Sequence, residues 1–288
     1  IVDDTASFYD MTWVEDVELG RGFLRLCESA SGGKVWRYET GGGLVPIGES
    51  LCLDQAGCRS SHWTSCDSIT DGGGKGLTLQ VFKDENRFNI GRLIIVESGE
   101  ERIVRLEEDG ARTPLVLNIP SLCGTGVSGR LNRPGRLLYN PFGDMLFTDT
   151  MECRDDPDAE TLFKSAIYRV KEVVNIPSIT FQQSRDAHTW TMKEMTEHHP
   201  DAQESVELSY NGMEYISDMI VGKDVTSLFV AGSISRPEGG CRKVIVKMID
   251  DTDATRTQNL DEMPVFFDMS EFYRIGQCTD EVIAMAIN

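Results

Sequence analysis

The amino-acid sequence predicts an all-β protein, a β-propeller built from four-stranded antiparallel blades. A two-part strand pattern recurs four times, in the same order, along the 288 residues. Equivalent positions Val35, Ile103, Ile167 and Val244 are 68, 64 and 77 residues apart. Repeated units of this size, each holding about four strands once loop insertions are subtracted, are typical of a propeller.

Each repeat contains three strand-like segments in succession. The first precedes the pattern: MTWVEDVE (11–18), GLTLQVF (76–82), PGRLLYN (134–140) and YISDMIV (215–221). The second is a continuous apolar run, as in a strand buried on both faces: GFLRLCES (22–29), GRLIIVES (91–98), GDMLFTDT (143–150) and TSLFVAGS (226–233). The third alternates apolar and polar residues, as in a half-exposed strand: KVWRYE (34–39), RIVRLE (102–107), AIYRVK (166–171) and KVIVKM (243–248).

The apolar runs predict which residues are buried between sheets. They are Leu24, Ile94, Ile95, Leu146, Phe147, Phe229 and Val230. The expectation rests on the apolar run that recurs at matching places in four units.

We interpret residues 1–288 as a single propeller domain with insertions at about 40–75, 154–164 and 182–209. Two stretches in or beside the last two insertions, DAETLFKSA (158–166) and TWTMKEMTEHH (189–199), are compatible with short helices. A fifth unit begins at 278–288 and lacks its apolar run, so we expect the blade set to be incomplete in this chain, because an unclosed propeller leaves exposed sheet edges.

Charge limits the classes of partner. The formal net charge is −19 and the isoelectric point is about 4.6, which argues against nucleic acid and anionic membrane surfaces. No apolar run approaches the ~20 residues of a membrane-spanning helix. Small polar ligands and proteins remain as the expected classes of partner, and the sequence does not indicate an oligomeric state. The chain starts at Ile1, so no targeting segment is readable.

The eight cysteines are even in number, which suits disulfides in an extracytoplasmic or lumenal compartment as well as it suits buried thiols. Cys52, Cys58 and Cys66 crowd one loop that lacks an apolar pattern. We expect at least one disulfide among these three, because a bridge would stabilise a loop that cannot bury itself.

The repeats resemble those of the SMP-30/gluconolactonase/luciferin-regenerating-enzyme family of six-bladed propellers. The resemblance is carried in order by GRLIIVESGEERIVRLEEDGARTPLV (91–116), LNRPGRLLYNPFGDMLFTDT (131–150), VGKDVTSLFVAGS (221–233) and GQCTDEVIAMAIN (276–288). It implies six blades. It also implies a divalent cation, commonly calcium, at the mouth of the central channel, where it polarises a lactone or ester carbonyl and activates water.

The family's four cation ligands map poorly onto this chain. Tyr9 stands at the position of the glutamate, with Asp10 one residue away. Gly135 replaces the first asparagine and is followed by Arg136. Ser217 stands at the second asparagine, with Asp218 adjacent, and Asp280 alone keeps the family's aspartate, which would take the proton in an active enzyme.

These substitutions leave three hypotheses. In the first, the metal site is rewritten, Asp280 points into the channel near Asp10 or Ser217 and Asp218, Arg136 pairs with Asp280, and the channel mouth binds a ligand or protein. In the second, Asp10, Asp218 and Asp280 form a new calcium cage, and the protein is a metal-dependent lactonase or ester hydrolase. In the third, it is a structural subunit of a larger assembly. His188, His198 and His199 lie in a polar insertion and are expected as loop residues rather than metal ligands.

Overall fold

The computed structural model describes the chain in segments: residues 8–16, 21–28, 34–39, 43–46, 76–81, 91–97, 102–107, 112–119, 129–131, 134–140, 143–153, 162–171, 173, 178, 206–224, 226–236, 240–249 and 258–269. Before residue 94 only the backbone is described. By compactness the chain divides into unit 1, which is Ile1–Asn118 with Glu172–Glu204, and unit 2, which is Ile119–Lys171 with Ser205–Asn288.

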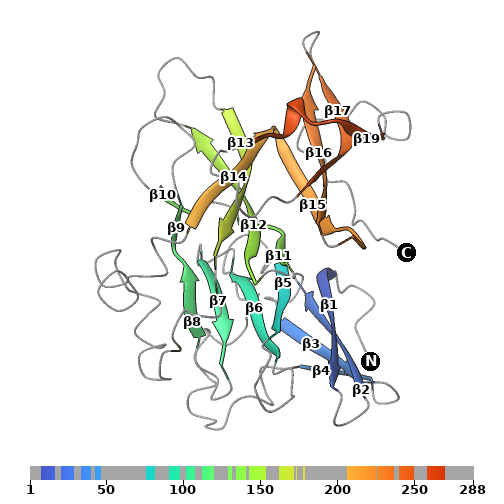
Figure 1. Cartoon of the computed structure of the whole chain (residues 1–288). Helices are drawn as coiled ribbons and strands as arrows, with labels where there is room; N and C mark the ends of the chain where they lie inside the picture. The colour runs from blue at the N-terminus through green and yellow to red at the C-terminus, as the bar shows by residue number, and fades with distance from the viewer. Residues whose placement is uncertain are drawn as a thin grey trace. The chain divides into compact units, whose positions relative to one another are not determined.

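Unit 1 holds two four-stranded antiparallel sheets, each a simple meander (Figure 1). The first is β1 (Phe8–Asp16), β2 (Arg21–Glu28), β3 (Lys34–Glu39) and β4 (Gly43–Pro46). The second is β5 (Gly76–Val81), β6 (Gly91–Glu97), β7 (Arg102–Leu106) and β8 (Arg112–Val116). The two sheets meet along β1, β2 and β5.

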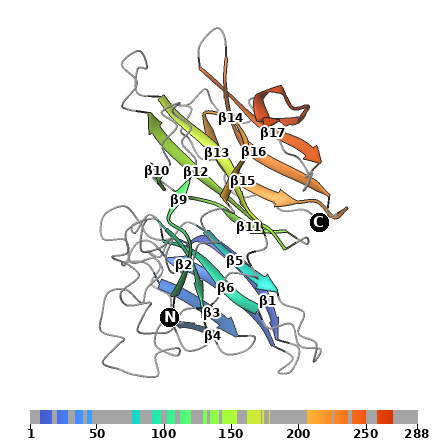
Figure 2. The ribbon, with the colours of Figure 1, turned by 60° about the vertical axis from the view of Figure 1, so that its left-hand side comes forward.

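Unit 2 also holds two large sheets (Figure 2). One contains β11 (Leu137–Tyr139), β12 (Met145–Cys153), β13 (Leu162–Val170) and β14 (Val206–Met213), with β18 (Gln258–Asn259) added in parallel to β14. The other contains β15 (Tyr215–Val221), β16 (Ser227–Ser235), β17 (Cys241–Ile249) and β19 (Val265–Asp268). The remaining elements are the short pair β9 (Asn118–Ile119) and β10 (Gly129–Arg130), and the single-turn 3-10 helix η5 (Leu260–Glu262).

The four sequence repeats coincide with the four sheets. In each sheet the segment before the pattern is the first strand, the apolar run is the second and the alternating segment is the third. The prediction of repeated four-stranded antiparallel units is therefore confirmed. The number of blades and the closure of a propeller stay predictions.

The core of unit 2 lies between its two sheets. Strands β12, β13 and β14, with η5, pack on β15, β16 and β17. The buried residues of this core are Leu146, Ile167, Tyr210, Met213, Ile216, Met219, Leu228, Val230, Val244, Val246, Met248 and Leu260. Burial of Ile94, Ile95, Leu146, Phe147 and Val230 is confirmed. Phe229 is only half-buried, because it lies on the face of β16 that points away from this core. The side chain of Leu24 lies outside the described residues.

Several local expectations need correction. The stretch 158–166 is not a helix over its second half, because Leu162–Ala166 alternates in polarity and pairs with β12 as part of β13. Two expected insertions also contain strands: β4 lies within 40–75, and β14 begins at Val206, because Val206, Leu208 and Tyr210 alternate with polar residues. The expected helix at 189–199 lies outside the described residues.

Two further points concern cysteines and membranes. Cys241, which begins β17, is buried and disulfide-bonded. Cys52, Cys58 and Cys66 lie outside the described residues, so the disulfide expected among them stays a prediction. In the part of the chain that the structure describes, no helix is long and apolar enough to cross a membrane.

Candidate functional site

Gly135 and Arg136 stand directly before β11, the first strand of its sheet, and they are held by Thr148 of β12. The Gly135 N–H donates to the Thr148 carbonyl at 2.9 Å, and the Thr148 N–H donates to the Arg136 carbonyl at 2.9 Å. The Arg136 N–H donates to Thr148 Oγ1 at 2.8 Å. Three hydrogen bonds therefore fix the backbone from which the Arg136 side chain leaves.

Gly135 has no room for a side chain. A Cβ atom built at this position would lie 2.8 Å from Thr148 Oγ1, closer than real Cβ contacts. Because the same Oγ1 atom accepts the Arg136 N–H, rotating it away would break that hydrogen bond. The asparagine that the family resemblance places here therefore does not fit this backbone.

The second part of the site is a β-bulge in β15. Ile216 faces Gly232 and Asp218 faces Ala231, so Ser217 is the extra residue on its strand. The Ser217 hydroxyl donates to the Ala231 carbonyl at 3.1 Å, and the Ser217 carbonyl accepts the Arg136 Nε–H at 2.8 Å. A bulge changes the direction of the backbone groups next to it, and here it presents a carbonyl to an arginine of the neighbouring sheet.

Asp218 completes an ion pair with Arg136. Asp218 Oδ1 lies 3.8 Å from Arg136 Nε, and the two side chains are only 15% and 21% exposed. The same oxygen accepts the N–H of Met219 at 2.9 Å, which orients the carboxylate. We call Gly135, Arg136, Thr148, Ser217 and Asp218 the Arg136 cluster.

The structure thus brings together four of the seven site residues expected from the sequence: Gly135, Arg136, Ser217 and Asp218. Tyr9 and Asp10 lie on β1, for which only the backbone is described, and Asp280 lies outside the described residues. Their roles stay predictions. Thr148 was missed, although its place in the apolar run opposite Arg136 in a hairpin was a usable signal.

The Arg136 cluster contains one guanidinium, one carboxylate and the hydroxyl groups of Ser217 and Thr148. Among the side chains that the structure describes, no group of three or more His, Cys, Asp or Glu residues could hold a metal ion. A guanidinium recognises planar anions such as carboxylate and phosphate through paired N–H groups. The described part of the site is therefore chemically suited to a polar or anionic ligand.

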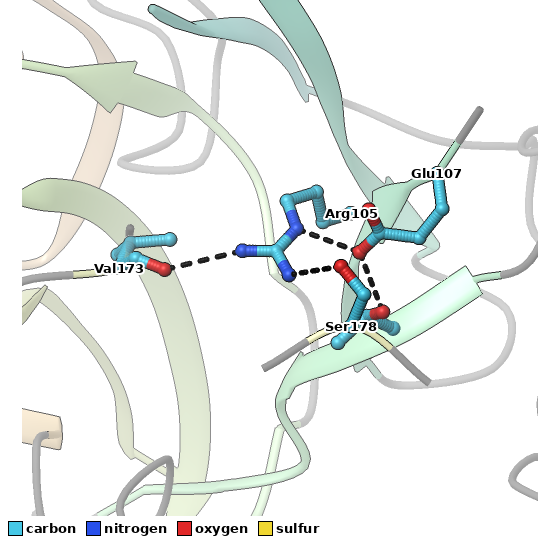
Figure 3. A network of polar contacts seen from close by, with 5 residues as sticks. Arg105, Glu107, Val173 and Ser178 are labelled. Carbon is cyan, nitrogen blue, oxygen red and sulfur yellow. Dashed lines mark hydrogen bonds and ion pairs between the residues drawn. The ribbon is translucent and has the colours of Figure 1, made fainter. Parts of the chain in front are cut away.

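A second polar cluster lies in unit 1 and is structural. Arg105 of β7 is 1% exposed; its Nε donates to Glu107 Oε1 at 2.7 Å, and that oxygen also accepts the Thr113 hydroxyl at 2.6 Å. The other guanidinium nitrogens donate to the Val173 carbonyl and to Ser178 Oγ, both at 3.2 Å. Figure 3 shows the Arg105 guanidinium between Val173 on one side and Glu107 with Ser178 on the other; Val173 and Ser178 belong to the connection after β13. Its burial leaves no access for a substrate.

A third buried group is the Asp149–Tyr168 pair in unit 2. Both residues are 0% exposed, and the Tyr168 ring stacks on Phe147 with 5.4 Å between centroids. Burial, and after it the negative charge of Asp149, raises the pKa of the Tyr168 hydroxyl well above its ordinary value. Tyr168 therefore stays neutral at any physiological pH.

Comparison with known proteins gives matches among solved structures alone. No family model matches the sequence. No curated protein matches it. The chain is similar to a gluconolactonase from Xanthomonas campestris, with 17% identity and a TM-score of 0.41 over 86% of this chain and 71% of that one. It is also similar to a second protein assigned to the gluconolactonases, with 13% identity and a TM-score of 0.45 over 89% and 69%. A puromycin hydrolase matches with 10% identity and a TM-score of 0.47, over 85% of this chain and 31% of that one.

Proposed function

We propose that this chain is a divergent propeller of the SMP-30/gluconolactonase type, with six blades in the closed fold, that binds a small polar ligand or a protein at its channel mouth. In this proposal the family's cation site is rewritten around Arg136, and the protein does not hydrolyse lactones. The four sheets, in the order of the four repeats, are its consecutive blades.

One observation carries the proposal. The Arg136 side chain reaches from the start of β11, the first strand of its sheet, to β15, the first strand of the other large sheet of unit 2, where it binds the Ser217 carbonyl and pairs with Asp218. Ser217 stands at a position where the family resemblance implies a cation ligand, and Asp218 is the next residue. A guanidinium carries a positive charge. At about 4 Å and an effective dielectric constant of about 20, its repulsion of a divalent cation is roughly 8 kcal/mol.

The oxygen atoms near Arg136 that could bind a cation are too few to offset this repulsion. Gly135 provides no side chain and cannot be replaced without moving Thr148. Asp218 is already engaged by Arg136 and by the Met219 N–H. A calcium ion needs six to eight oxygen ligands, so a cage here would require Asp10 and Asp280 to converge on Asp218 while Arg136 turns away.

Calorimetric titration with calcium and hydrolysis of an aldonolactone, with and without chelator, test the proposal. We expect no saturable calcium binding and background turnover in the wild type and in Asp280→Ala. Tight calcium binding that is lost in Asp280→Ala, together with chelator-sensitive turnover, would overturn the proposal and establish the metal-dependent hydrolase.

A second experiment tests the ligand side, with gluconate as the carboxylate probe. We expect saturable binding that Arg136→Gln weakens about tenfold or more, as expected for loss of one charge-assisted hydrogen bond. The matched control is Arg242→Gln, since Arg242 also pairs with an aspartate, Asp268, at 2.7 Å but lies on β17 and is 42% exposed. Equal loss in both variants would show that general charge, and not the Arg136 cluster, binds the probe.

A further inference from the structure

The sheet of β15, β16, β17 and β19 has an outer face that is covered at one end only. Val244, Val246 and Met248 of β17 lie in the core, so the odd-numbered residues of β17 point to the opposite face, which we call the outer face. Along this face the exposed fraction rises from 5% at Lys243 to 70% at Ile249. One end of the outer face is therefore buried within the chain, and the other end is open.

The covered end consists of five described residues. They are Ala231 and Ser233 of β16, Cys241 and Lys243 of β17, and Met269, and none of them is more than 7% exposed. Ser233 is in register with Lys243, and the Met269 N–H donates to the Lys243 carbonyl at 2.8 Å. The chain therefore leaves β19 beside the covered end, with residues 270–288 still to follow.

The strands that the structure describes do not account for this cover. Those with extensive contacts to the sheet are β11, β13 and β14, and they belong to the sheet that packs on the core side. The cover therefore comes from residues outside the described part of the chain. Residues 270–288 belong to unit 2 and start at the covered end, so they are the segment in position to supply it.

Cys241 is one of the buried residues at the covered end, and it is disulfide-bonded. Four of the other seven cysteines belong to unit 1. Within unit 2, Cys153 ends β12, a strand of the sheet on the core side, and Cys123 lies in the connection between β9 and β10. Cys278 follows Met269 by nine residues. It is the cysteine that the path of the chain brings to the outer face.

Lys243 places a cation at the covered end. Its Nζ donates to Ser233 Oγ at 2.9 Å, and the two residues are 5% and 0% exposed. A serine hydroxyl does not neutralise an ammonium group, and a buried charge needs a partner of opposite sign. Residues 270–288 contain three acidic residues, Glu271, Asp280 and Glu281.

Matched spacings select one of these three carboxylates. Lys243 follows Cys241 by two residues on one face of β17, and Asp280 follows Cys278 by two residues, which places both on one face of an extended segment. In the proposed propeller the first strand of the next blade runs in the same direction as β17. A disulfide holds two Cα atoms about 4.4–6.8 Å apart, so joining Cys278 to Cys241 sets Asp280 opposite Lys243. Glu281, one residue further on, then points the other way.

We propose that Cys278 is the disulfide partner of Cys241 and that Asp280 is the counter-ion of Lys243. The disulfide forms from two thiols, and a donor disulfide accepts the two electrons and two protons that the thiols lose. The inference rests on the proposed function in one respect, which is the assignment of residues 278–288 to the next blade.

The ion pair extends the proposed function to the one aspartate that matches the family's cation ligand. Arg136 pairs with Asp218, and Lys243 pairs with Asp280. Neither carboxylate is then left to bind calcium, and Asp280 is held away from the role of proton acceptor that the family resemblance implies.

Peptide mapping of the wild type without reduction tests the disulfide. After thiols are blocked with iodoacetamide, trypsin releases residues 224–242 and 275–288, and each of these peptides contains one cysteine. We expect mass spectrometry to find the two peptides linked, and dithiothreitol to separate them. Alkylated Cys278, or Cys241 linked to any other cysteine, would overturn the proposal. The mapping uses the wild type alone, so folding defects of a variant do not affect it.

Thermal unfolding of variants tests the ion pair. We expect Lys243→Met and Asp280→Asn each to lower the melting midpoint by about 5 °C or more, because each leaves a buried charge unpaired. The double variant should melt no lower than the less stable single variant, because both substitutions remove one interaction. Glu281→Gln is the matched control, and its effect should add to that of Lys243→Met. Additive effects of the Lys243 and Asp280 substitutions, or coupling of Lys243→Met to Glu271→Gln instead, would overturn the assignment.

These measurements are separable from the tests of the proposed function. Neither involves calcium, a ligand or lactone turnover, so either one can fail while the calorimetric and lactonase experiments still support a rewritten cation site. The opposite result, calcium binding that is lost in Asp280→Ala, would overturn both the proposed function and the Lys243–Asp280 pair.

Discussion

The contact between Gly135 and Thr148 predicts a strong coupling between two substitutions. In Gly135→Ala the new Cβ would meet Thr148 Oγ1 at 2.8 Å, so the hydroxyl must rotate and give up the Arg136 N–H. Leaving that partly buried donor without its acceptor costs about 1–3 kcal/mol, and the displaced rotamer adds about 0.5–1.5 kcal/mol. Thr148→Ala alone loses the hydrogen bond, at about 1–2 kcal/mol.

In the double variant the hydroxyl is already absent, so the new Cβ has space. We therefore expect Gly135→Ala to cost almost nothing in the Thr148→Ala background, which corresponds to a coupling energy of about 2 kcal/mol. Urea unfolding of the wild type, the two single variants and the double variant measures this energy. Thr148→Ser is the control background, since it keeps the hydroxyl and should keep the cost. Additivity of the two single effects within about 0.5 kcal/mol would refute the reasoning.

Three further predictions concern the ionisable groups. Arg105→Met should lower the free energy of unfolding by about 3–5 kcal/mol in urea titrations, because it leaves the Glu107 charge buried without its partner. The double variant Arg105→Met/Glu107→Met should recover most of that loss. The hydrogen bond from the Ser227 hydroxyl, and after it the bond from the Ser227 N–H, lowers the pKa of the Asp224 carboxyl. The contribution of Asp224 to folding stability is therefore present above the ordinary carboxyl pKa and is lost as the pH falls through the lowered pKa of Asp224. Ser227→Ala should raise the Asp224 pKa in an NMR titration, and an unchanged value would contradict this assignment. Tyr168 has a raised pKa, so its contribution to stability is complete below the ordinary tyrosine pKa and declines at higher pH; Tyr168→Phe should leave the native phenolate absorbance titration unchanged.

Strand order was largely predictable from the sequence. The repeated runs that contain Ile94–Ile95, Leu146–Phe147 and Val230 are second strands with these side chains buried, and such burial requires continuous apolar composition at fixed places in each unit. The alternating segments that follow pair with them as third strands. Fourth strands were harder, because β4 and β14 come after turns or long connections and are short or mostly polar.

The site was predictable in part. The resemblance placed Gly135, Arg136, Ser217 and Asp218 near one another, and the structure joins them, but which carboxylate faces Arg136 follows from the bulge at Ser217. A bulge is one extra residue in a strand, and no residue type in the sequence YISDMIV predicts that a bulge forms there. Thr148 was missed because threonine is common in strands, although its place opposite Arg136 in a hairpin was a usable signal; its hydroxyl accepts the Arg136 N–H and lies close to Gly135.

The buried guanidinium of Arg105 has a consequence for how this chain can be divided. Its partners Val173 and Ser178 lie some 70 positions later in the sequence, between two neighbouring strands of a sheet that belongs to the other unit. A fragment ending at Asn118 would keep both sheets of unit 1 and yet leave this cation in the protein interior with two of its acceptors removed. A fragment starting at Ile119 would contain the Val173 carbonyl and the Ser178 hydroxyl but not the arginine that donates to them. During synthesis, Arg105 can make all of these hydrogen bonds only after the chain has been made as far as Ser178, which is more than half of its length.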